Sequence, residues 1–229
     1  MHYIIELFVI LTLLIIPPFF SNQVPKLTIP TFSWKDILIF GTIALYCFIR
    51  VKDEKTKDYP INYFKPNSIK NNKSKKSIYF KTLLLSFISL GFLFLNGYFW
   101  QWISKAPVEK TFFSNSTLWY IFQIFGIFVY AFYEETMYRY FLPTSIGKNL
   151  SIISKSENPP KWIFALCEII ALLLFSFGHL YMGIFAVLNG FFAGIALRFL
   201  VWKTKSVFPS TIIHFIYNLV LYLSMFTKA

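Results

Sequence analysis

Long apolar stretches alternate with shorter polar segments along the whole chain. Each stretch is close to the ~20 residues that an α-helix needs to cross the hydrocarbon core of a bilayer. Within lipid a segment must satisfy its own backbone hydrogen bonds, so these stretches are expected to be helical. The pattern predicts an all-α, polytopic transmembrane bundle of about seven spans, within a range of about six to eight. Their approximate limits are 3–20, 34–50, 79–99, 117–142, 162–180, 182–202 and 207–226.

The composition supports a membrane protein and excludes an ordinary soluble domain. Hydrophobic residues make up 56% of the chain and charged residues 14%, whereas a soluble domain carries roughly 25% charged residues. The first apolar stretch has no basic residues before it and no small-residue cleavage site, so it is expected to be a retained span rather than a removed signal peptide. We expect residues 1–229 to form one membrane domain.

The basic residues that give the net charge of +12 are distributed unevenly along the chain, as they are where loop charges set the orientation of a membrane protein. Ten of the 22 basic residues lie between Arg50 and Lys81, and a basic loop between apolar spans normally faces the cytoplasm. This distribution of basic residues among the loops predicts a multi-pass protein of the cell membrane. Its N-terminus and the loop at 50–81 would be cytoplasmic, and its C-terminus external. A second basic loop is expected at 198–206. No nucleic-acid-binding motif accompanies the charge, so a nucleic-acid partner is not expected.

The two cysteines, Cys47 and Cys167, both fall within apolar stretches. Their spacing fits neither a zinc site nor a disulfide scaffold. They are predicted to be packing residues.

Ionisable and amide side chains are concentrated in three of the last four predicted spans. Such groups are costly inside a bilayer and usually face a cavity or a partner. This asymmetry predicts an N-terminal scaffold at 1–116 and an active core at 117–222. The residues concerned are Glu134, Glu135, Arg139, Glu168, His179, His214 and Asn218.

Helical spacing separates the two adjacent glutamates. Glu135 and Arg139 are four residues apart, so they share a face and can pair. Glu134 points about 100° away around the helix, which leaves it available as a general acid or base. His214 and Asn218 are also four residues apart and could donate two hydrogen bonds to one oxyanion. Either pair could instead serve only helix packing.

Three motifs in order, EExxxR, FxxxH and HxxxN, resemble the CPBP family, which contains type II CAAX prenyl proteases and bacterial bacteriocin-processing or immunity relatives of the Abi type. Here they begin at Glu134, at Phe175 and at His214. A small-xxx-small pair, Gly190 and Gly194, lies between the last two motifs.

The resemblance implies hydrolysis of peptide bonds within the membrane. It assigns the activation of water to Glu134 and His179, and the stabilisation of the oxyanion to His214 and Asn218. It gives Glu135 and Arg139 a supporting role. No cofactor is then needed. In a zinc-dependent alternative, Glu134, His179 and His214 would be the ligands, which is a legitimate catalytic zinc set. The absence of HExxH favours the metal-free version.

Two points stay open at this stage. Glu168 lies eleven residues before His179 and shares its helical face, so it either lines the same cavity or is a carboxylate without a catalytic part. His179 is expected near the opposite end of its span from the depth of Glu134. Part of 143–161 would then have to re-enter the membrane, or the span would have to tilt, around a water-filled cavity open to one face.

The predicted function is therefore that of an intramembrane endopeptidase acting on a peptide or a membrane-associated protein tail. Processing of a bacteriocin or pheromone, or self-immunity, fits such an enzyme. The alternative is a non-catalytic immunity or scaffolding protein of the same fold. A transporter with midplane acids is a third class, but no internal repeat supports it.

Overall fold

The computed structural model describes residues 2–12, 31–53, 75–107, 111–112, 116–154 and 161–227. These residues are almost entirely helical, which confirms the all-α class. The elements are α1 (His2–Ile10), α2 (Trp34–Asp53), α3 (Lys75–Ser104), β1 (Thr111–Phe112), α4 (Thr117–Thr136), the π-helical turn η3 (Met137–Phe141), α5 (Leu142–Ser154), α6 (Lys161–Phe177), the 3₁₀ turn η4 (Leu180–Met182), α7 (Ile184–Thr204), α8 (Phe208–Ser224) and β2 (Phe226–Thr227).

Several of the described helices have the length and composition of membrane spans. Three are long and apolar enough to cross a bilayer: Ser77–Ser104, Thr117–Leu150 and Ile184–Thr204. Two shorter apolar helices cover Trp162–Phe177 and Phe208–Ser224. The molecule is thus a helical membrane-type bundle, while the count of seven spans stays a prediction. Residues 13–20 of the first predicted span, residues 21–30 that follow it, and residues 54–74 of the basic loop lie outside the described residues.

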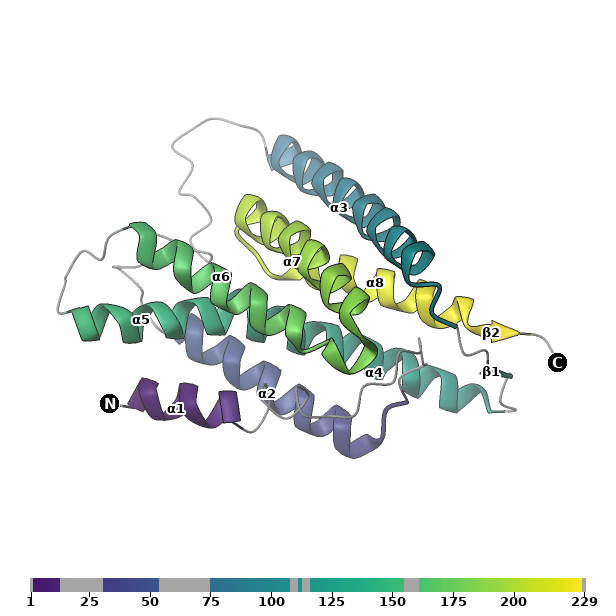
Figure 1. Ribbon diagram of the computed structural model, residues 1–229, viewed down its shortest axis with the longest axis horizontal. Coiled ribbons are helices and arrows are strands. Elements are labelled where there is room, and N and C mark those ends of the chain that lie inside the picture. The colour runs from purple at the N-terminus through teal and green to yellow at the C-terminus, as the bar shows by residue number, and fades with distance from the viewer. Residues whose placement is uncertain are drawn as a thin grey trace.

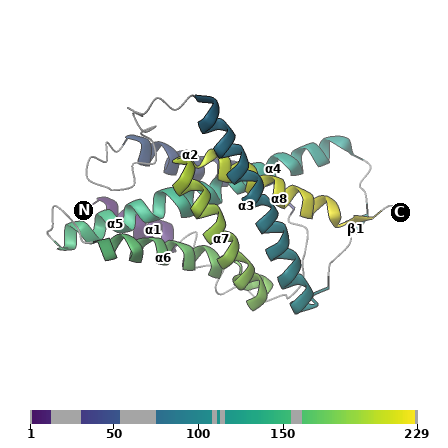
Figure 2. The ribbon, with the colours of Figure 1, turned by 90° about the horizontal axis from the view of Figure 1, so that it is seen from above.

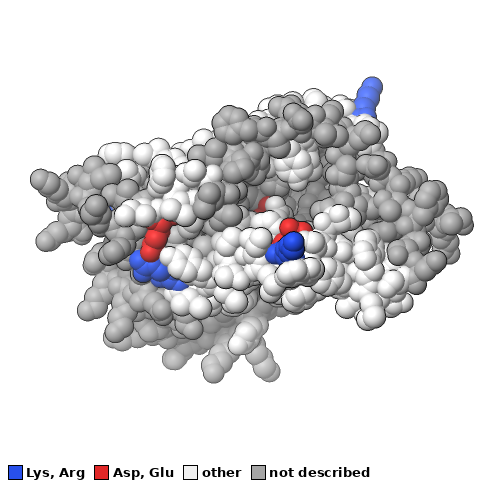
Figure 3. Space-filling view, turned by 90° about the horizontal axis from the view of Figure 1, so that it is seen from below, with Lys and Arg blue, Asp and Glu red and all other residues white. Residues whose placement is uncertain are grey.

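The surface of the described part is largely apolar. On the face shown in Figure 3, charged side chains gather in a few small groups and the rest of the described surface is uncharged. Large exposed hydrophobic side chains cover α3 in particular, among them Phe87, Leu95 and Tyr98. A soluble protein rarely exposes so continuous an apolar surface, so lipid is the medium that this surface fits.

The helices pack as a bundle around α4 and α8. Figures 1 and 2 place α3 at one edge beside α7 and α8, and α1 and α2 at the opposite edge beside α4 and α5. The most extensive contacts join α3 with α7, α2 with α4, α6 with α7, and α4 with α8. The strands β1 and β2 form one short parallel pair. The larger cluster of buried hydrophobic residues joins α2, α4, η3, α5 and α6, and a smaller one joins α3, α7 and α8. The three motifs lie on α4 and η3, at the end of α6, and on α8.

The fourth predicted span continues far beyond its expected end at residue 142. α4, η3 and α5 follow one another without a break from Thr117 to Ser154, so the expectation of a loop over 143–161 is wrong for residues 143–154. Residues 142–147 at the start of α5 are all buried, the polar Thr144 and Ser145 among them, and α5 packs against α6 and α1. The polar residues of this segment suggested a loop, but tertiary packing makes it a helix.

Arg198 also lies outside the loop predicted for it, because α7 continues to Thr204. It donates from Nη1 to the backbone carbonyl of Arg139, 2.7 Å away. In an α-helix that carbonyl would accept from the N–H of residue 143, but residue 143 is a proline and has none. Arg198 thus supplies a side-chain donor from α7 to a carbonyl inside the π turn η3.

Two small residues allow α6 and α7 to approach closely. A Cβ atom at Gly194 would lie 2.5 Å from Leu172 Cδ1. At Gly190 it would lie 3.4 Å from His179 Nδ1. The small-xxx-small pair is therefore a helix contact, as such pairs are in membrane bundles. Cys47 and Cys167 are both buried, which confirms their predicted packing role.

Candidate active site

The two adjacent glutamates lie at the end of α4, immediately before the π turn η3. Both are buried, with 5% of Glu134 and none of Glu135 exposed. Thr136 ends α4 with its hydroxyl donating to the carbonyls of Phe132 and Tyr133. A π turn inserted into a long helix frequently marks a functional site. Here it changes the direction of the side chains between Glu135 and the residues that follow.

Glu135 and Arg139 form the pair that their spacing predicts. Arg139 Nε lies 3.6 Å from Glu135 Oε1, and both side chains are buried. The guanidinium carbon of Arg139 also lies 3.7 Å from the ring centroid of Phe175 on α6. This cation–π contact ties the first residue of the FxxxH motif to the arginine of the EExxxR motif. Sequence spacing alone does not reveal that link.

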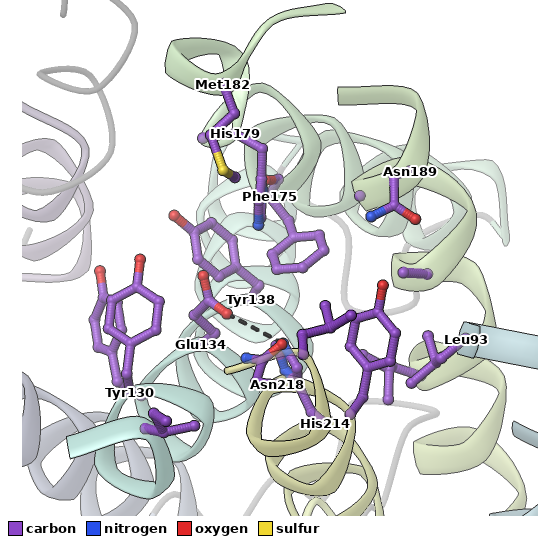
Figure 4. Close-up of a pocket in the computed structure, with 18 of the residues that line it drawn as sticks. Leu93, Tyr130, Glu134, Tyr138, Phe175, His179, Met182, Asn189, His214 and Asn218 are labelled. Carbon is purple, nitrogen blue, oxygen red and sulfur yellow. Dashed lines mark hydrogen bonds and ion pairs between the residues drawn. The ribbon is translucent and has the colours of Figure 1, made fainter. Parts of the chain in front are cut away.

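His214 on α8 lies between the two glutamates. Its Nδ1 is 3.0 Å from Glu135 Oε1, and its Nε2 is 3.5 Å from Glu134 Oε2. Figure 4 shows Glu134 directed toward His214, with Asn218 beside them. A carboxylate accepts, so Nδ1 carries a hydrogen and donates it to Glu135. Glu135 therefore orients His214 as well as Arg139.

One cavity of about 480 Å³ brings the four predicted catalytic residues together. Its wall includes Glu134, His179, His214 and Asn218. The rest of the lining is mostly aromatic and aliphatic, including Tyr130, Tyr133, Tyr138, Phe175, Leu93, Leu197, Tyr217 and Leu221. A small number of polar groups on a largely apolar wall is the usual composition of a ligand site.

The length of α5 explains how His179 reaches this cavity. α5 and α6 pack against each other as successive helices. Because the rod of α4, η3 and α5 continues to Ser154, α6 runs back along it for 17 residues and ends beside η3. His179 follows the end of α6 by two residues, so it reaches the level of Glu134. No re-entrant segment is needed among residues 143–154. Residues 155–160 lie outside the described part.

His179 is held in one tautomer by a backbone carbonyl near the end of α6. Its Nδ1 lies 2.9 Å from the carbonyl oxygen of Phe175. A carbonyl can only accept, so Nδ1 donates and the Nε2 of the neutral ring keeps its lone pair. His179 can therefore accept a proton or a hydrogen bond at Nε2.

Glu168 is not part of the wall of the 480 Å³ cavity. It forms an ion pair with Arg198 on α7, and the same arginine donates to the Arg139 carbonyl. The sequence places Glu168 and His179 on one helical face, but it does not reveal the partner on another helix. Glu168 thus takes part in helix packing near η3.

The zinc alternative names Glu134, His179 and His214 as ligands. In the part of the chain that the structure describes, no group of three or more His, Cys, Asp or Glu side chains is placed to hold a metal ion. Zinc dependence is therefore a question for metal analysis.

A cavity lined by a glutamate, two histidines and an asparagine, set in a helical membrane-type bundle, defines a candidate hydrolytic centre. Residues 115–220 match the family model described as Type II CAAX prenyl endopeptidase Rce1-like. This match confirms the resemblance that the three motifs carry, and the matched segment contains every motif residue. Comparisons with curated proteins and with solved structures found no match. The match supports protease activity in general terms, with a peptide or protein substrate.

Proposed function

We propose that the protein is an intramembrane endopeptidase in which Glu134 is the general base. The observation that carries this proposal is the position of His214, between Glu134 and Glu135 on the wall of a cavity that His179 and Asn218 share. Glu135 is engaged by Arg139 and His214, so Glu134 is the carboxylate available to a bound water.

The reaction begins with proton transfer from water to Glu134. His179 accepts a hydrogen bond from the same water at Nε2, which orients it. The hydroxide attacks the peptide carbonyl carbon, and the carbonyl oxygen becomes an oxyanion. Glu134 then gives the proton to the leaving nitrogen as the C–N bond breaks, so it acts first as base and then as acid.

The oxyanion is held by donors from α8. Asn218 can donate from its amide, and His214 can donate from Nε2 only as an imidazolium, because its Nδ1–H is already directed at Glu135. Glu135 supplies the countercharge for that cation. Fixed donors at the position where charge develops give a large part of catalysis in acyl transfer.

The substrate that we propose is a peptide or a membrane-associated protein tail, such as a peptide pheromone or a bacteriocin precursor. Its carbonyl must enter a cavity whose wall is largely apolar, so a hydrophobic, extended segment fits better than a folded domain. The enzyme would act in the cell membrane, with its N-terminus in the cytoplasm.

The test is a comparison of Glu134→Gln with the wild-type protein in lipid nanodiscs. A pool of internally quenched hydrophobic peptides is the probe. We expect the wild-type protein to cleave members of the pool and Glu134→Gln to lose at least about 100-fold in rate, the lower range for removing a general base. Cleavage at the wild-type rate by the variant would disprove the role of Glu134.

A non-catalytic immunity or scaffolding role is the alternative outcome. It predicts that protection or signalling in cells survives both Glu134→Ala and His214→Ala while the variants still insert into the membrane. If the protein is the proposed protease, both variants should lose this protection or signalling.

A further inference from the structure

A polar group that belongs to none of the three motifs lies on the cavity wall. Asn189 on α7 lines the cavity and is half-buried. Figure 4 shows its side chain on the wall across from Glu134, with its nitrogen turned toward Phe175 and the cavity. Its neighbours along this wall, Ala193 and Leu197, are apolar. An amide among such residues is a candidate for recognition of a substrate.

The orientation of this amide is fixed by a chain of hydrogen bonds from α3. Trp100 Nε1 donates to Asn96 Oδ1 at 3.0 Å, and an indole N–H can only donate. Asn96 Nδ2 donates to the backbone carbonyl of Asn189 at 3.0 Å, and a carbonyl can only accept. These two partners determine which end of the Asn96 amide is oxygen and which is nitrogen.

The same Asn96 Nδ2 lies 2.6 Å from a side-chain atom of Asn189. Because Asn96 presents a donor there, that atom must be the acceptor Oδ1 of Asn189. The Nδ2 group of Asn189, with its two hydrogens, is consequently turned away from α3. The hydroxyl of Tyr217 on α8 is one polar neighbour of this amide. A second hydrogen is left for a group inside the cavity.

The junction that holds Asn96, Asn189 and Tyr217 has no spare room. A Cβ atom at Gly97, next to Asn96, would lie 2.3 Å from the Tyr217 hydroxyl oxygen. α3 and α7 also share an extensive contact. Asn189 is therefore a preorganised donor. Its side chain is already held in place, so ligand binding does not cost the entropy of ordering it.

The charge of the wall indicates which acceptor this donor fits. Among the described residues that line the cavity, Glu134 is the single acid and there is no lysine or arginine. A terminal carboxylate would enter close to the like charge of Glu134, and the cation that the mechanism forms on His214 already has Glu135 as its countercharge. An unpaired charge is unfavourable in such a low-dielectric site. A neutral backbone carbonyl avoids that cost and still accepts the hydrogen bond.

We infer that Asn189 is a substrate-positioning residue, which donates from Nδ2 to a backbone carbonyl oxygen of an uncharged peptide segment that flanks the bond to be cleaved. Asn96 orients Asn189 for this contact. The inference rests on the proposed function, because it places the peptide between the wall of α7 and the groups of α4 and α8.

The test measures peptide affinity in the Glu134→Gln background, in which turnover is removed. The probes are two dye-labelled pools of short peptides made from Ala, Leu, Phe, Gly and Ser, one ending in an amide and the other in a free carboxylate. We expect Asn189→Ala to weaken binding of the amide pool about fivefold to tenfold, the effect of one hydrogen bond. The matched control is Asn149→Ala on α5, which is outside the cavity and should leave affinity unchanged.

A second variant separates recognition from packing. Asn96→Asp offers only acceptors to Asn189, so the Asn189 amide should turn over and present Oδ1 to the cavity. The affinity for the amide pool should then fall as it does in Asn189→Ala, although Asn189 is still present. The double variant Asn96→Asp/Asn189→Ala should bind no more weakly than Asn189→Ala alone, because both act on one contact. Thermal unfolding shows that each variant is folded.

Three results would overturn the inference: unchanged affinity in folded Asn189→Ala, a loss limited to the carboxylate pool, or no binding of either pool to the Glu134→Gln protein. Failure of the proposed function looks different. In that case the Glu134→Gln variant cleaves as fast as the wild-type protein, while the effect of Asn189 on affinity is unaffected.

Discussion

His214 Nδ1 lies 3.0 Å from Glu135 Oε1, across 79 positions of the sequence and between two different helices. The second carboxylate of the pair therefore orients the histidine of the HxxxN motif. Through the same oxygen it faces Arg139 Nε at 3.6 Å. Glu135 is thus the residue that connects the first motif to the last.

Glu135→Gln should be strongly destabilising. The variant leaves the guanidinium of Arg139 buried without its carboxylate, and removing one partner of a buried ion pair costs about 3–5 kcal/mol. The free energy of unfolding in detergent measures the effect. The matched control is Glu6→Gln, which removes a half-exposed partner of Arg50 and should cost no more than about 1 kcal/mol. Equal losses in the two variants would contradict the role of Glu135.

The contact between Arg139 and Phe175 should contribute to stability beyond charge alone. Arg139→Lys keeps the charge but loses the planar group that lies over the ring, so we expect a loss of about 1–2 kcal/mol in the free energy of unfolding. A double-mutant cycle with Phe175→Leu should show coupling of that order. The same cycle with the exposed Phe199 should be additive, and coupling there would show that the effect is not local.

Much of the candidate site was predictable because its parts are local. The pairing of Glu135 with Arg139 follows from helical spacing, and the structure confirms it. Three motifs on apolar segments were enough to predict the family whose model residues 115–220 match. Helical spacing also left Glu134 without a partner on its own helix. In the structure Glu134 lies on the cavity wall, where its neighbour is His214 from α8.

The parts that sequence reasoning missed depend on tertiary packing. The contact of His214 with Glu135 joins α8 to α4, and no periodicity predicts which helices become neighbours. The polar residues of 143–154 resembled a loop, although packing against α1 and α6 makes them helical. That error produced the apparent difference in depth between Glu134 and His179. Asn189 was missed because an amide within an apolar span has no motif around it.

Replacing Arg198 alone should lower the free energy of unfolding more than replacing Arg198 and Glu168 together. Arg198→Met leaves the Glu168 carboxylate without its cation and removes the donor to the Arg139 carbonyl. Adding Glu168→Gln removes the unpaired charge, so the double variant should recover part of the lost free energy of unfolding. Chemical denaturation of the two variants tests this. A double variant that is less stable than Arg198→Met alone would contradict the arrangement.

Chelation should leave activity unchanged if Glu134 activates water without a metal. Elemental analysis of protein purified without a histidine tag, combined with activity before and after chelation, measures this directly. Stoichiometric zinc that is lost in His179→Ala and in His214→Ala, with activity restored by added zinc, would instead establish the zinc-dependent mechanism. Ligands must be deprotonated to bind, so such zinc binding would also weaken as the pH falls.

Gly194→Ala should disturb both the α6–α7 contact and the active site. The added methyl group would lie 2.5 Å from Leu172 Cδ1 and 3.2 Å from Phe175 Cδ1, and overpacking of this kind costs about 1–3 kcal/mol. Because Arg139 lies over the Phe175 ring, displacement of that ring should also reduce the rate of peptide cleavage. Leu172→Ala in the same chain removes the nearer clash, so the double variant should regain stability relative to Gly194→Ala. If Gly194→Ala is as stable as the wild-type protein, the two helices do not pack as closely as the structure describes.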